Sequence, residues 1–300
     1  MDPILNHIIS FARVRSIDTY LKRYQKAGFV TDKPTVRHNP GKRNGFVYFG
    51  PDYVEFFWVE DKKKFSREAN ACEKHFSHFP SPFGVAFESG DLRAFRTSAV
   101  RKGYKLKPVW SKAPADGDPS DPWWSFLTVP LQYVPGAWTF CLTYLKRTPN
   151  RARKIKIGRN GIFGVAGVVM ISDIPAKRVA QWSKFLGGKK LSSSRIQLGP
   201  HYVEWQTPHE FRARYGLKDS RTRGKMKAYA EIGVIHLLAK DLSIAKSVLR
   251  KSGFRVKAQD EGFLIKPDKR DGYVFLVTEG SVTKWIKERA LYGQKLKIVP

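Results

Sequence analysis

The stretch IISFARVRSIDTYLKRYQKAGF, residues 8–29, contains the pattern that decides the fold. It begins with an apolar run typical of a strand and passes through a short polar turn. It continues as an amphipathic segment in which Ile17, Leu21 and Tyr24 fall on one helical face. Gly28 follows and is well placed to end a helix, because glycine readily adopts the left-handed conformation needed there. The stretch therefore predicts a strand, a helix and a glycine stop.

The same order of elements returns three times along the chain. The later copies are GVAFESGDLRAFRTSAVRKGY (84–104), AGVVMISDIPAKRVAQWSKFLGG (166–188) and IGVIHLLAKDLSIAKSVLRKSGF (232–254). Their expected glycine stops are Gly103, Gly187 or Gly188, and Gly253. Strand-like runs separated by Gly-Pro, Pro-Gly or Asp-Gly follow the predicted helices. The repeat therefore predicts an α+β protein built from four βαβββ modules.

A single βαβββ module leaves one face of its curled sheet open, so two modules must combine to close a core. We expect neighbouring modules to pair into two half-open barrels, although pairing between other modules is an alternative for this architecture. The basic, proline-containing segment near residues 147–160 is the natural division. The predicted domains are residues 1–148, with modules one and two, and residues 149–300, with modules three and four.

The composition is that of a packed globular protein. Hydrophobic residues make up 42% and aromatic residues 13% of the 300 residues. No apolar run is long enough to cross a bilayer, and the first residues do not resemble a signal peptide. The two cysteines, Cys72 and Cys141, suit a reducing compartment, and Cys141 is expected to be a small core residue. We therefore expect a cytoplasmic protein with no membrane partner.

The net charge of +29 is unevenly distributed. Residues 1–150 carry 23 basic and 14 acidic side chains, whereas residues 151–300 carry 32 and 12. The densest basic runs are RTPNRARKIKIGRNG (147–161) and FRARYGLKDSRTRGKMK (211–227). Such runs attract polyanions non-specifically, or they simply serve solubility. A nucleic-acid scaffold that uses Arg151–Arg159 and Arg212–Lys227 is one hypothesis, although the aromatic residues do not interleave with these basic runs.

Two polar side chains interrupt apolar, strand-like runs. His7 lies within LNHIISFAR (5–13), and Glu55 lies within DYVEFFWVED (52–61). A buried imidazole and a buried carboxylate require hydrogen-bond partners, a redistributed proton or a metal ion. The two residues are therefore either polar residues with local partners or two halves of a metal site.

Residues 4–61 resemble the first module of glyoxalase-like domains. The resemblance rests on His7 in the first strand, on RHNPGKRNG (37–45) with Arg37, His38, Gly41 and Asn44, and on DYVEFF (52–57) with Tyr53 and Glu55. In this respect the chain is similar to the vicinal-oxygen-chelate superfamily, which includes glyoxalases, bleomycin-resistance proteins and extradiol dioxygenases. The other three modules resemble this superfamily in the order of their elements only.

The resemblance implies that the first and last strands of a module are adjacent, so that His7 and Glu55 meet in a cup as metal ligands. The metal would be a divalent ion such as Fe, Mn, Ni or Zn, and Glu55 would act at the reacting centre. Arg37, His38 and Asn44 would line the mouth and bind a small molecule with vicinal oxygens, unless they form an ordinary exposed turn. The implied reaction is that of a lyase, an isomerase or a dioxygenase.

The sequence departs from the superfamily pattern at the partner ligands. Alignment of the first strands places non-ligating residues at the position of His7, namely Gly84 or Val85, Gly167 and Gly233. Among the last strands, module three supplies Glu204, whereas module two offers Phe140 or Cys141 and module four offers Phe275. Substitute ligands would be His38, His75 or His78. A degenerate cup without metal is therefore the competing interpretation.

A metal-free binding protein of the bleomycin-resistance type is a further hypothesis. It would hold an aromatic or apolar ligand among residues such as Tyr48, Phe57, Trp58, Trp124 and Trp138. The other histidines have structural interpretations. We expect His236 to be a core histidine with a backbone partner, and His201 and His209 to lie on turns. No pattern predicts an oligomeric state.

Overall fold

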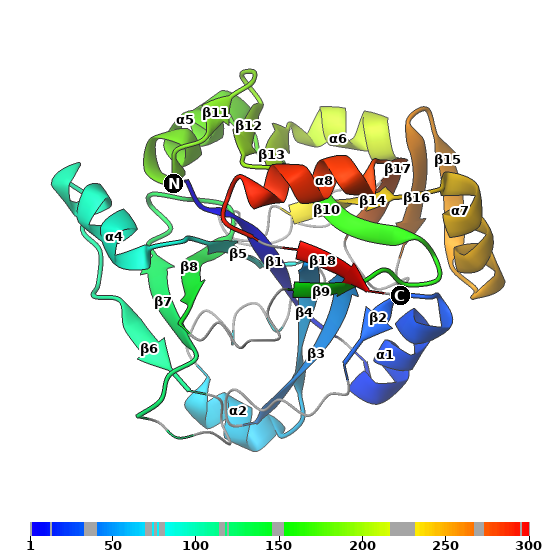
Figure 1. Ribbon diagram of the computed structural model, residues 1–300, viewed down its shortest axis with the longest axis horizontal. Helices are drawn as coiled ribbons and strands as arrows, with labels where there is room; N and C mark the ends of the chain where they lie inside the picture. Colours follow the sequence, from blue (N-terminus) through cyan, green and yellow to red (C-terminus); the bar gives the residue numbers. More distant parts are fainter. Residues whose placement is uncertain are drawn as a thin grey trace.

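The structure is a computed structural model that describes residues 2–12, 14–32, 41–69, 74, 77, 82–113, 118, 120–145, 153–216, 232–266, 273–294 and 296–299. Two eight-stranded mixed sheets form its framework (Figure 1). The first sheet has the order β2 (Val30–Thr31), β3 (Lys42–Phe49), β4 (Asp52–Val59), β1 (Ile4–Phe11), β5 (Gly84–Glu88), β8 (Trp138–Tyr144), β7 (Trp124–Val129), β6 (Trp110–Lys112). The second sheet has the order β11 (Lys189–Lys190), β12 (Arg195–Leu198), β13 (His201–Gln206), β10 (Ile162–Ile171), β14 (Ile232–Ala239), β17 (Val274–Glu279), β16 (Gly262–Lys266), β15 (Arg255–Gln259).

The strand orders confirm the four predicted βαβββ modules and the pairing of neighbours. Modules one and two share the first sheet, in which β1 pairs with β4 of its own module and with β5 of the next. Modules three and four share the second sheet in the same way, through β10, β13 and β14. The predicted division between residues 148 and 149 lies outside the described residues.

Each module contains one helix after its first strand, as the repeat predicts. These helices are α1 (Ile17–Lys26), α4 (Leu92–Arg101), α5 (Pro175–Leu186) and α7 (Leu242–Lys251), and Figure 1 shows them at the periphery. Three of them begin at a side chain that accepts a backbone N–H of the first turn, and these caps are Ser16, Asp91 and Asp241. The fourth begins with Pro175 at its first turn. All the predicted glycine stops have positive φ angles.

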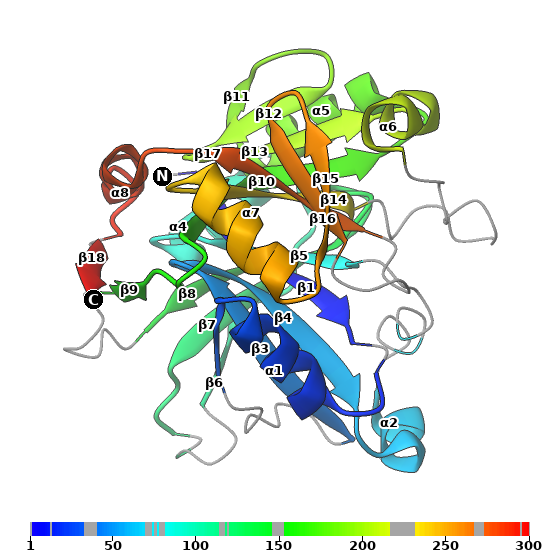
Figure 2. The same ribbon diagram turned by 90° about the vertical axis from the view of Figure 1, so that its right-hand side faces the viewer.

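Three further helices within the described ranges follow the last strands of three modules. They are α2 (Lys62–Glu68), α6 (Pro208–Tyr215) and α8 (Val282–Ala290). After α8 the chain forms β18 (Leu296–Val299), which pairs in parallel with β9 (Arg153–Lys156) in a separate two-stranded sheet. Figure 2 shows α8 and β18 along one side of the molecule, past both sheets. Among the described residues, no helix has the length and apolar character required to cross a membrane.

The two faces of each sheet belong to different cores. The helix-covered faces of both sheets merge into one continuous core that includes Ile8, Val54 and Cys141 from the first sheet and Val168 from the second. Cys141 is fully buried, as expected, and burial raises the pKa of its thiol to about 12. Two smaller clusters cover the opposite faces. We call these opposite faces the first cup, which carries His7 and Glu55, and the second cup, which carries Glu204.

Two equivalent Gly-Pro turns meet where the sheets pack together. GPDYVE (50–55) and GPHYVE (199–204) connect corresponding strands of modules one and three. Gly50 has a φ of 67°, and a Cβ there would lie 2.1 Å from the carbonyl oxygen of Phe163 in the other sheet. Only glycine therefore permits both this turn and this close approach.

The residues after the two turns form a buried polar cluster between the sheets. The Asp52 carboxylate accepts hydrogen bonds from Arg289 Nη1 at 2.5 Å and from the Val165 amide at 3.0 Å. Arg289 Nη1 also donates to His201 Nε2 at 2.8 Å. His201 is the first residue of β13 and lies between the two sheets, so the prediction that it lies on a turn is wrong. His209 lies in α6 and not on a turn.

Candidate functional site

A β-bulge in β1 orients the polar residues of the first cup. The antiparallel register between β1 and β5 shifts between Leu5 and His7, so that Asn6 is the extra residue. A bulge breaks the strict alternation of side chains and lets neighbouring residues approach the same site. The Asn6 and His7 side chains indeed contact each other, with Asn6 Oδ1 2.7 Å from His7 Nδ1.

The hydrogen bonds of Asn6 determine which nitrogen of His7 carries the proton. Asn6 Nδ2 donates to Glu88 Oε2 at 2.8 Å, and this contact fixes the orientation of the amide because a carboxylate only accepts. Asn6 Oδ1 is then the acceptor that faces His7, so His7 Nδ1 must be the donor. The lone pair of the neutral imidazole is therefore on Nε2. Histidines that bind metals commonly show this arrangement, in which one nitrogen donates to a neighbouring acceptor.

His7 and Glu55 converge as the sequence predicts. The parallel register pairs His7 with Tyr53 and Ile9 with Glu55, which brings both polar side chains to the same face. His7 Nε2 lies 3.5 Å from Glu55 Oε2. The two residues are only 3% and 8% exposed. Glu55 Oε1 also accepts a hydrogen bond from Asn44 Nδ2.

The separation of the two atoms is compatible with a shared metal ion. Two ligand atoms that each lie about 2.1 Å from one ion are about 3.0 Å apart at right angles and about 3.4 Å apart at the tetrahedral angle. The 3.5 Å between His7 Nε2 and Glu55 Oε2 is close to the second value. An imidazole nitrogen and a carboxylate oxygen also match the ligand preferences of Fe, Mn, Ni and Zn.

The second module adds an aromatic ring where a third ligand would lie. His7 pairs with Ala86 on β5, and the Phe140 ring of β8 lies 5.6 Å from the His7 ring. Within the described part of the chain, no three His, Cys, Asp or Glu residues come together as a metal-binding group. The predicted substitutes His38, His75 and His78 lie outside the described residues, as does Arg37. The described protein donors at this site are therefore His7 and Glu55.

Asn44 lies deeper than predicted. It is buried in β3 and contacts the Glu55 carboxylate, whereas a residue that lines the mouth would be exposed. Its position is diagonal to Glu55 across the hairpin, because the register pairs Asn44 with Phe57 and Phe46 with Glu55. Asn44 therefore holds one carboxylate oxygen and leaves the other directed at His7.

Aromatic side chains surround the polar pair in the first cup. The Tyr53 ring stacks on His7 with centroids 4.5 Å apart and an interplanar angle of 12°. Of the five proposed ligand contacts, Tyr48, Phe57, Trp124 and Trp138 belong to the aromatic contacts of this face. Trp58 instead packs against the helix-covered core and donates to the Val14 carbonyl at 2.9 Å. The first cup is thus mainly aromatic, with a polar centre.

The second cup repeats the bulge without its polar side chains. The register of β10 against β14 shifts between Val165 and Gly167, so that Ala166 and Gly167 occupy the places of Asn6 and His7. A Cβ on Gly167 would lie 2.7 Å from Cγ of Tyr202, whose ring fills this space. The second cup therefore has neither a histidine at this position nor room for one.

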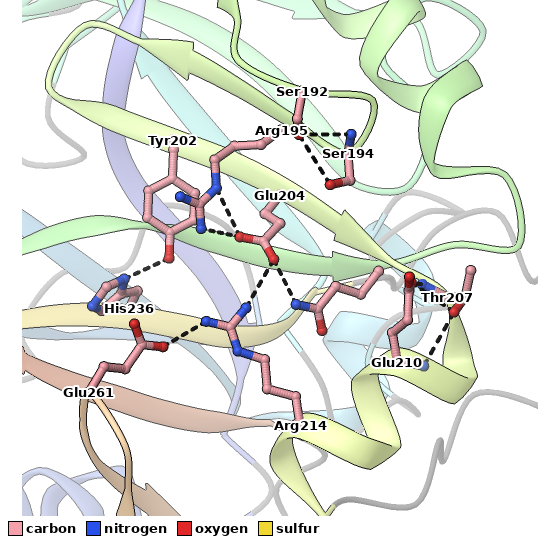
Figure 3. A network of polar contacts seen from close by, with 11 residues as sticks. Ser192, Ser194, Arg195, Tyr202, Glu204, Thr207, Glu210, Arg214, His236 and Glu261 are labelled. Atoms are coloured by element: carbon pink, nitrogen blue, oxygen red, sulfur yellow. Dashed lines mark hydrogen bonds and ion pairs between the residues drawn. The ribbon is translucent and has the colours of Figure 1, made fainter.

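Glu204, the counterpart of Glu55, is bound by two arginines (Figure 3). Arg195 donates from Nε to Glu204 Oε2 at 2.9 Å, and Arg214 Nη1 donates to Oε1 at 3.1 Å. Gln206 Nε2 donates to the same Oε1 at 2.6 Å. Both carboxylate oxygens are thus engaged by cationic or amide donors, which makes Glu204 a poor metal ligand or base. The structure does not bring Glu204 together with Glu55.

His236 lies beside this network with two side-chain partners. Its Nδ1 is 2.6 Å from the Tyr202 hydroxyl, and its Nε2 is 2.7 Å from Thr278 Oγ1. The expected backbone partner is therefore wrong. Burial lowers the pKa of the His236 imidazole to about 4, so the ring is neutral at pH 7. A neutral ring suits the bonding of both nitrogens to hydroxyl groups, which can each donate or accept.

Because burial lowers the pKa of His236, we expect the folded protein to lose stability in acid. The unfolded state takes up a proton near pH 6.5, whereas the folded state resists protonation until about pH 4. The free energy of unfolding should therefore fall by up to about 3 kcal/mol as the pH decreases through this window. Urea unfolding at several pH values should show that the free energy of unfolding depends less steeply on pH in His236→Gln than in wild type. Replacement of the exposed His209 by glutamine should leave the dependence unchanged, and equal slopes in all three proteins would contradict this role.

The profile of the glyoxalase-like domain family matches residues 5–186, which is more than half of the chain. The chain belongs to the glyoxalase-like domain family. The matched region contains the whole first cup, including His7, Asn44, Glu55 and Phe140, and it ends at the last residue of α5. A search of the curated proteins finds no relative of this glyoxalase-like chain.

Solved structures share the vicinal-oxygen-chelate fold of this glyoxalase-like chain. A hypothetical protein from Staphylococcus aureus matches with a TM-score of 0.57 and 12% identity, over 93% of this chain and 100% of its own. A variant of 4-hydroxymandelate synthase from Streptomyces coelicolor matches with a TM-score of 0.55 and 11% identity, over 98% of this chain and 99% of its own. A xylose isomerase-like TIM barrel/4-hydroxyphenylpyruvate dioxygenase fusion protein has a TM-score of 0.51 and 12% identity, over 97% of this chain and 52% of its own. At these identities the likeness concerns the fold.

Sequence reasoning missed the residues that support the predicted pair. Asn6 contacts His7 and stands beside it in LNHIISFAR, but the sequence does not show that its side chain faces the same site. Glu88, which binds Asn6, lies on β5 in the second module. Counting outward from the Gly-Pro turn would have found the Arg195–Glu204 pair, because these residues face each other across the β12–β13 hairpin. Of the basic runs 151–159 and 212–227, residues 153–159 and 212–216 are described, and the others lie outside the described residues.

Proposed function

We propose that this glyoxalase-like protein binds a small molecule with vicinal oxygens in the first cup, at a divalent metal ion held by His7 and Glu55. The observation that carries the proposal is the contrast between the two cups. Both have the same bulge and the same last-strand glutamate, but only the first combines a histidine with a carboxylate whose oxygen faces it. In the second cup, glycine and two arginines occupy the corresponding places.

A bound divalent ion would supply Lewis-acid polarisation of substrate oxygens. The protein's own residues would hold and orient the partners of that chemistry. Asn6 keeps the proton on His7 Nδ1, so that the lone pair of the neutral ring is on Nε2. Asn44 holds one oxygen of Glu55 and leaves the other beside His7. Because two protein donors occupy few positions around an ion, the remaining positions are open to substrate oxygens or water.

The aromatic walls of the first cup support an aromatic or planar group in the ligand. Tyr53 and Phe140 flank the His7 ring, and Trp124, Phe126 and Trp138 continue the aromatic face. Arg37 and His38 would then bind the polar end of the ligand at the mouth, as the sequence predicts. The same walls also favour the second candidate, a metal-free protein of the bleomycin-resistance type that holds an aromatic ligand without transforming it.

Metal binding separates the two candidates. We expect metal-depleted wild-type protein to take up close to one Mn²⁺, Fe²⁺, Ni²⁺ or Zn²⁺ per chain, measured by elemental analysis after dialysis. His7→Ala should take up none above background, because it removes the only imidazole described in the cup. Glu204→Gln is the matched control, since it alters the equivalent strand position of the other cup and should retain full uptake. Equal uptake by His7→Ala and wild type would contradict the site, and no uptake by any of them would favour the metal-free candidate.

A further inference from the structure

The C-terminal segment from Arg289, in the last turn of α8, to Gln294 contacts both large sheets. Arg289 is 0% exposed and Gln294 is 6% exposed, so both side chains are buried between the sheets. They lie outside residues 5–186, the part of the chain that matches the family. Figure 2 shows this part of the chain passing from α8 beside the second sheet to β18.

Four hydrogen bonds in series connect Arg289 to His7. Arg289 Nε donates to Gln294 Oε1 at 2.6 Å, and Gln294 Nε2 donates to Glu88 Oε2 at 2.8 Å. Asn6 Nδ2 donates to the same Glu88 oxygen at 2.8 Å, and His7 Nδ1 lies 2.7 Å from Asn6 Oδ1. The series of contacts thus joins residue 289 to residue 7, which lies in the first sheet.

The chemistry of the groups forces the direction of each bond. Arginine has only donors, so Gln294 must present its oxygen to Arg289 and its amide hydrogens to Glu88. A carboxylate has only acceptors, so Asn6 must present its amide hydrogens to Glu88 and its oxygen to His7. The bond to His7 can then form only if Nδ1 carries the proton. No other tautomer of neutral His7 satisfies every member of the chain.

We propose that the segment from Arg289 to Gln294 is a positioning element of the first cup, which fixes the tautomer and orientation of His7 through Glu88 and Asn6. The same segment also anchors the strand that carries the other half of the pair. Arg289 Nη1 binds Asp52 at the start of β4, three positions before Glu55. The C-terminal segment therefore holds both the β1 residue and the β4 strand of the site. This inference rests on the proposed function only in treating His7 as the functional side chain.

The tautomer of His7 can be measured without any activity. Long-range ¹H–¹⁵N spectra of metal-free, histidine-labelled protein at pH 8 distinguish a protonated ring nitrogen from an unprotonated one, and a His7→Gln spectrum assigns the signals. We expect wild-type His7 to be entirely the Nδ1–H tautomer. Glu88→Leu removes the acceptor that fixes the Asn6 amide, so the amide can reverse and the two tautomers should mix. Gln294→Leu removes the donor that holds the Glu88 carboxylate beside Asn6, so the carboxylate can turn away and the tautomers should mix in this variant as well.

The control for these variants is Gln259→Leu. Gln259 also donates a hydrogen bond, to the Arg214 carbonyl at 3.2 Å, but it lies on β15 of the second sheet. The Gln259→Leu variant should leave the His7 signals unchanged. Retention of the pure Nδ1–H tautomer in both Glu88→Leu and Gln294→Leu would overturn the proposal, as would an Nε2–H tautomer in the wild type.

A second readout separates this proposal from the proposed function. If His7 binds a metal, the loss of such an orienting partner should weaken Zn²⁺ affinity about tenfold to a hundredfold in Glu88→Leu and Gln294→Leu. Unchanged Zn²⁺ affinity in both variants would overturn the positioning role. If the wild type binds no metal, the metal site itself is refuted, and the tautomer spectra still decide whether the C-terminal segment positions His7.

Discussion

Replacement of Arg289 by leucine is expected to lower the free energy of unfolding by about 3–5 kcal/mol. The guanidinium is fully buried and lies 2.5 Å from an equally buried carboxylate, that of Asp52. Burial alone would raise the pKa of Asp52, but Arg289 and His201 outweigh it and hold the pKa below its ordinary value. Without the arginine, the carboxylate must remain charged in a dry interior or take up a proton, and both outcomes cost stability.

Urea unfolding of a double-mutant cycle can isolate this effect. Asp52→Asn together with Arg289→Leu removes both charges, so the double variant should be more stable than Arg289→Leu alone. Lys284→Leu is the matched control on the same helix, because its ion pair with Glu288 is solvent-exposed and should contribute less than about 0.5 kcal/mol. A loss of less than about 1 kcal/mol for Arg289→Leu would show that the cluster does not hold the sheets together.

Phe140→His is expected to raise the metal affinity of the first cup by about a hundredfold to a thousandfold. Structural sites with four ligands bind Zn²⁺ with a free energy of about 10–16 kcal/mol, which is roughly 3 kcal/mol for each ligand. The ring of Phe140 already lies 5.6 Å from His7, on the strand where the second module lacks a ligand. A histidine at this position would complete a site with two imidazoles and one carboxylate.

Competition with a zinc chelator should measure the gain in Phe140→His. Phe126→His is the matched control, because the Phe126 ring contacts Phe140 at 5.7 Å on the same face. Phe126 lies on β7, one strand further than β8 from the strand that carries His7, so the metal affinity of Phe126→His should stay near that of wild type. Equal affinities for Phe140→His and wild type would mean that the side chain at position 140 cannot reach an ion bound by His7 and Glu55.

Most of the fold could be predicted from the sequence because its signals are local. The apolar faces of the four helices, their caps and their glycine stops each lie within one stretch of about twenty residues. The His7–Glu55 contact also followed from the fold, since the first and last strands of a module are adjacent in it. Neighbour pairing of the modules was an assumption that the strand orders confirm.

The polar cluster between the sheets could not be predicted in the same way. Asp52 and His201 occupy the same position in two copies of one turn, and a comparison of GPDYVE with GPHYVE shows an acid in one and a base in the other. Their meeting depends on how the two sheets pack, which no local pattern specifies. Arg289, 237 positions from Asp52 along the chain, resembles any other basic residue of an amphipathic helix.

Anomalous scattering from crystals soaked in Mn²⁺ or Zn²⁺ tests the central claim most directly. The account predicts one strong anomalous peak in the first cup, about 2.0–2.2 Å from His7 Nε2 and from a Glu55 oxygen, and none at Glu204. His7→Ala crystals soaked in the same way should lack this peak. A fully occupied ion bound elsewhere, or a first cup without an anomalous peak at saturating metal, would contradict the assignment of His7 and Glu55 as metal ligands.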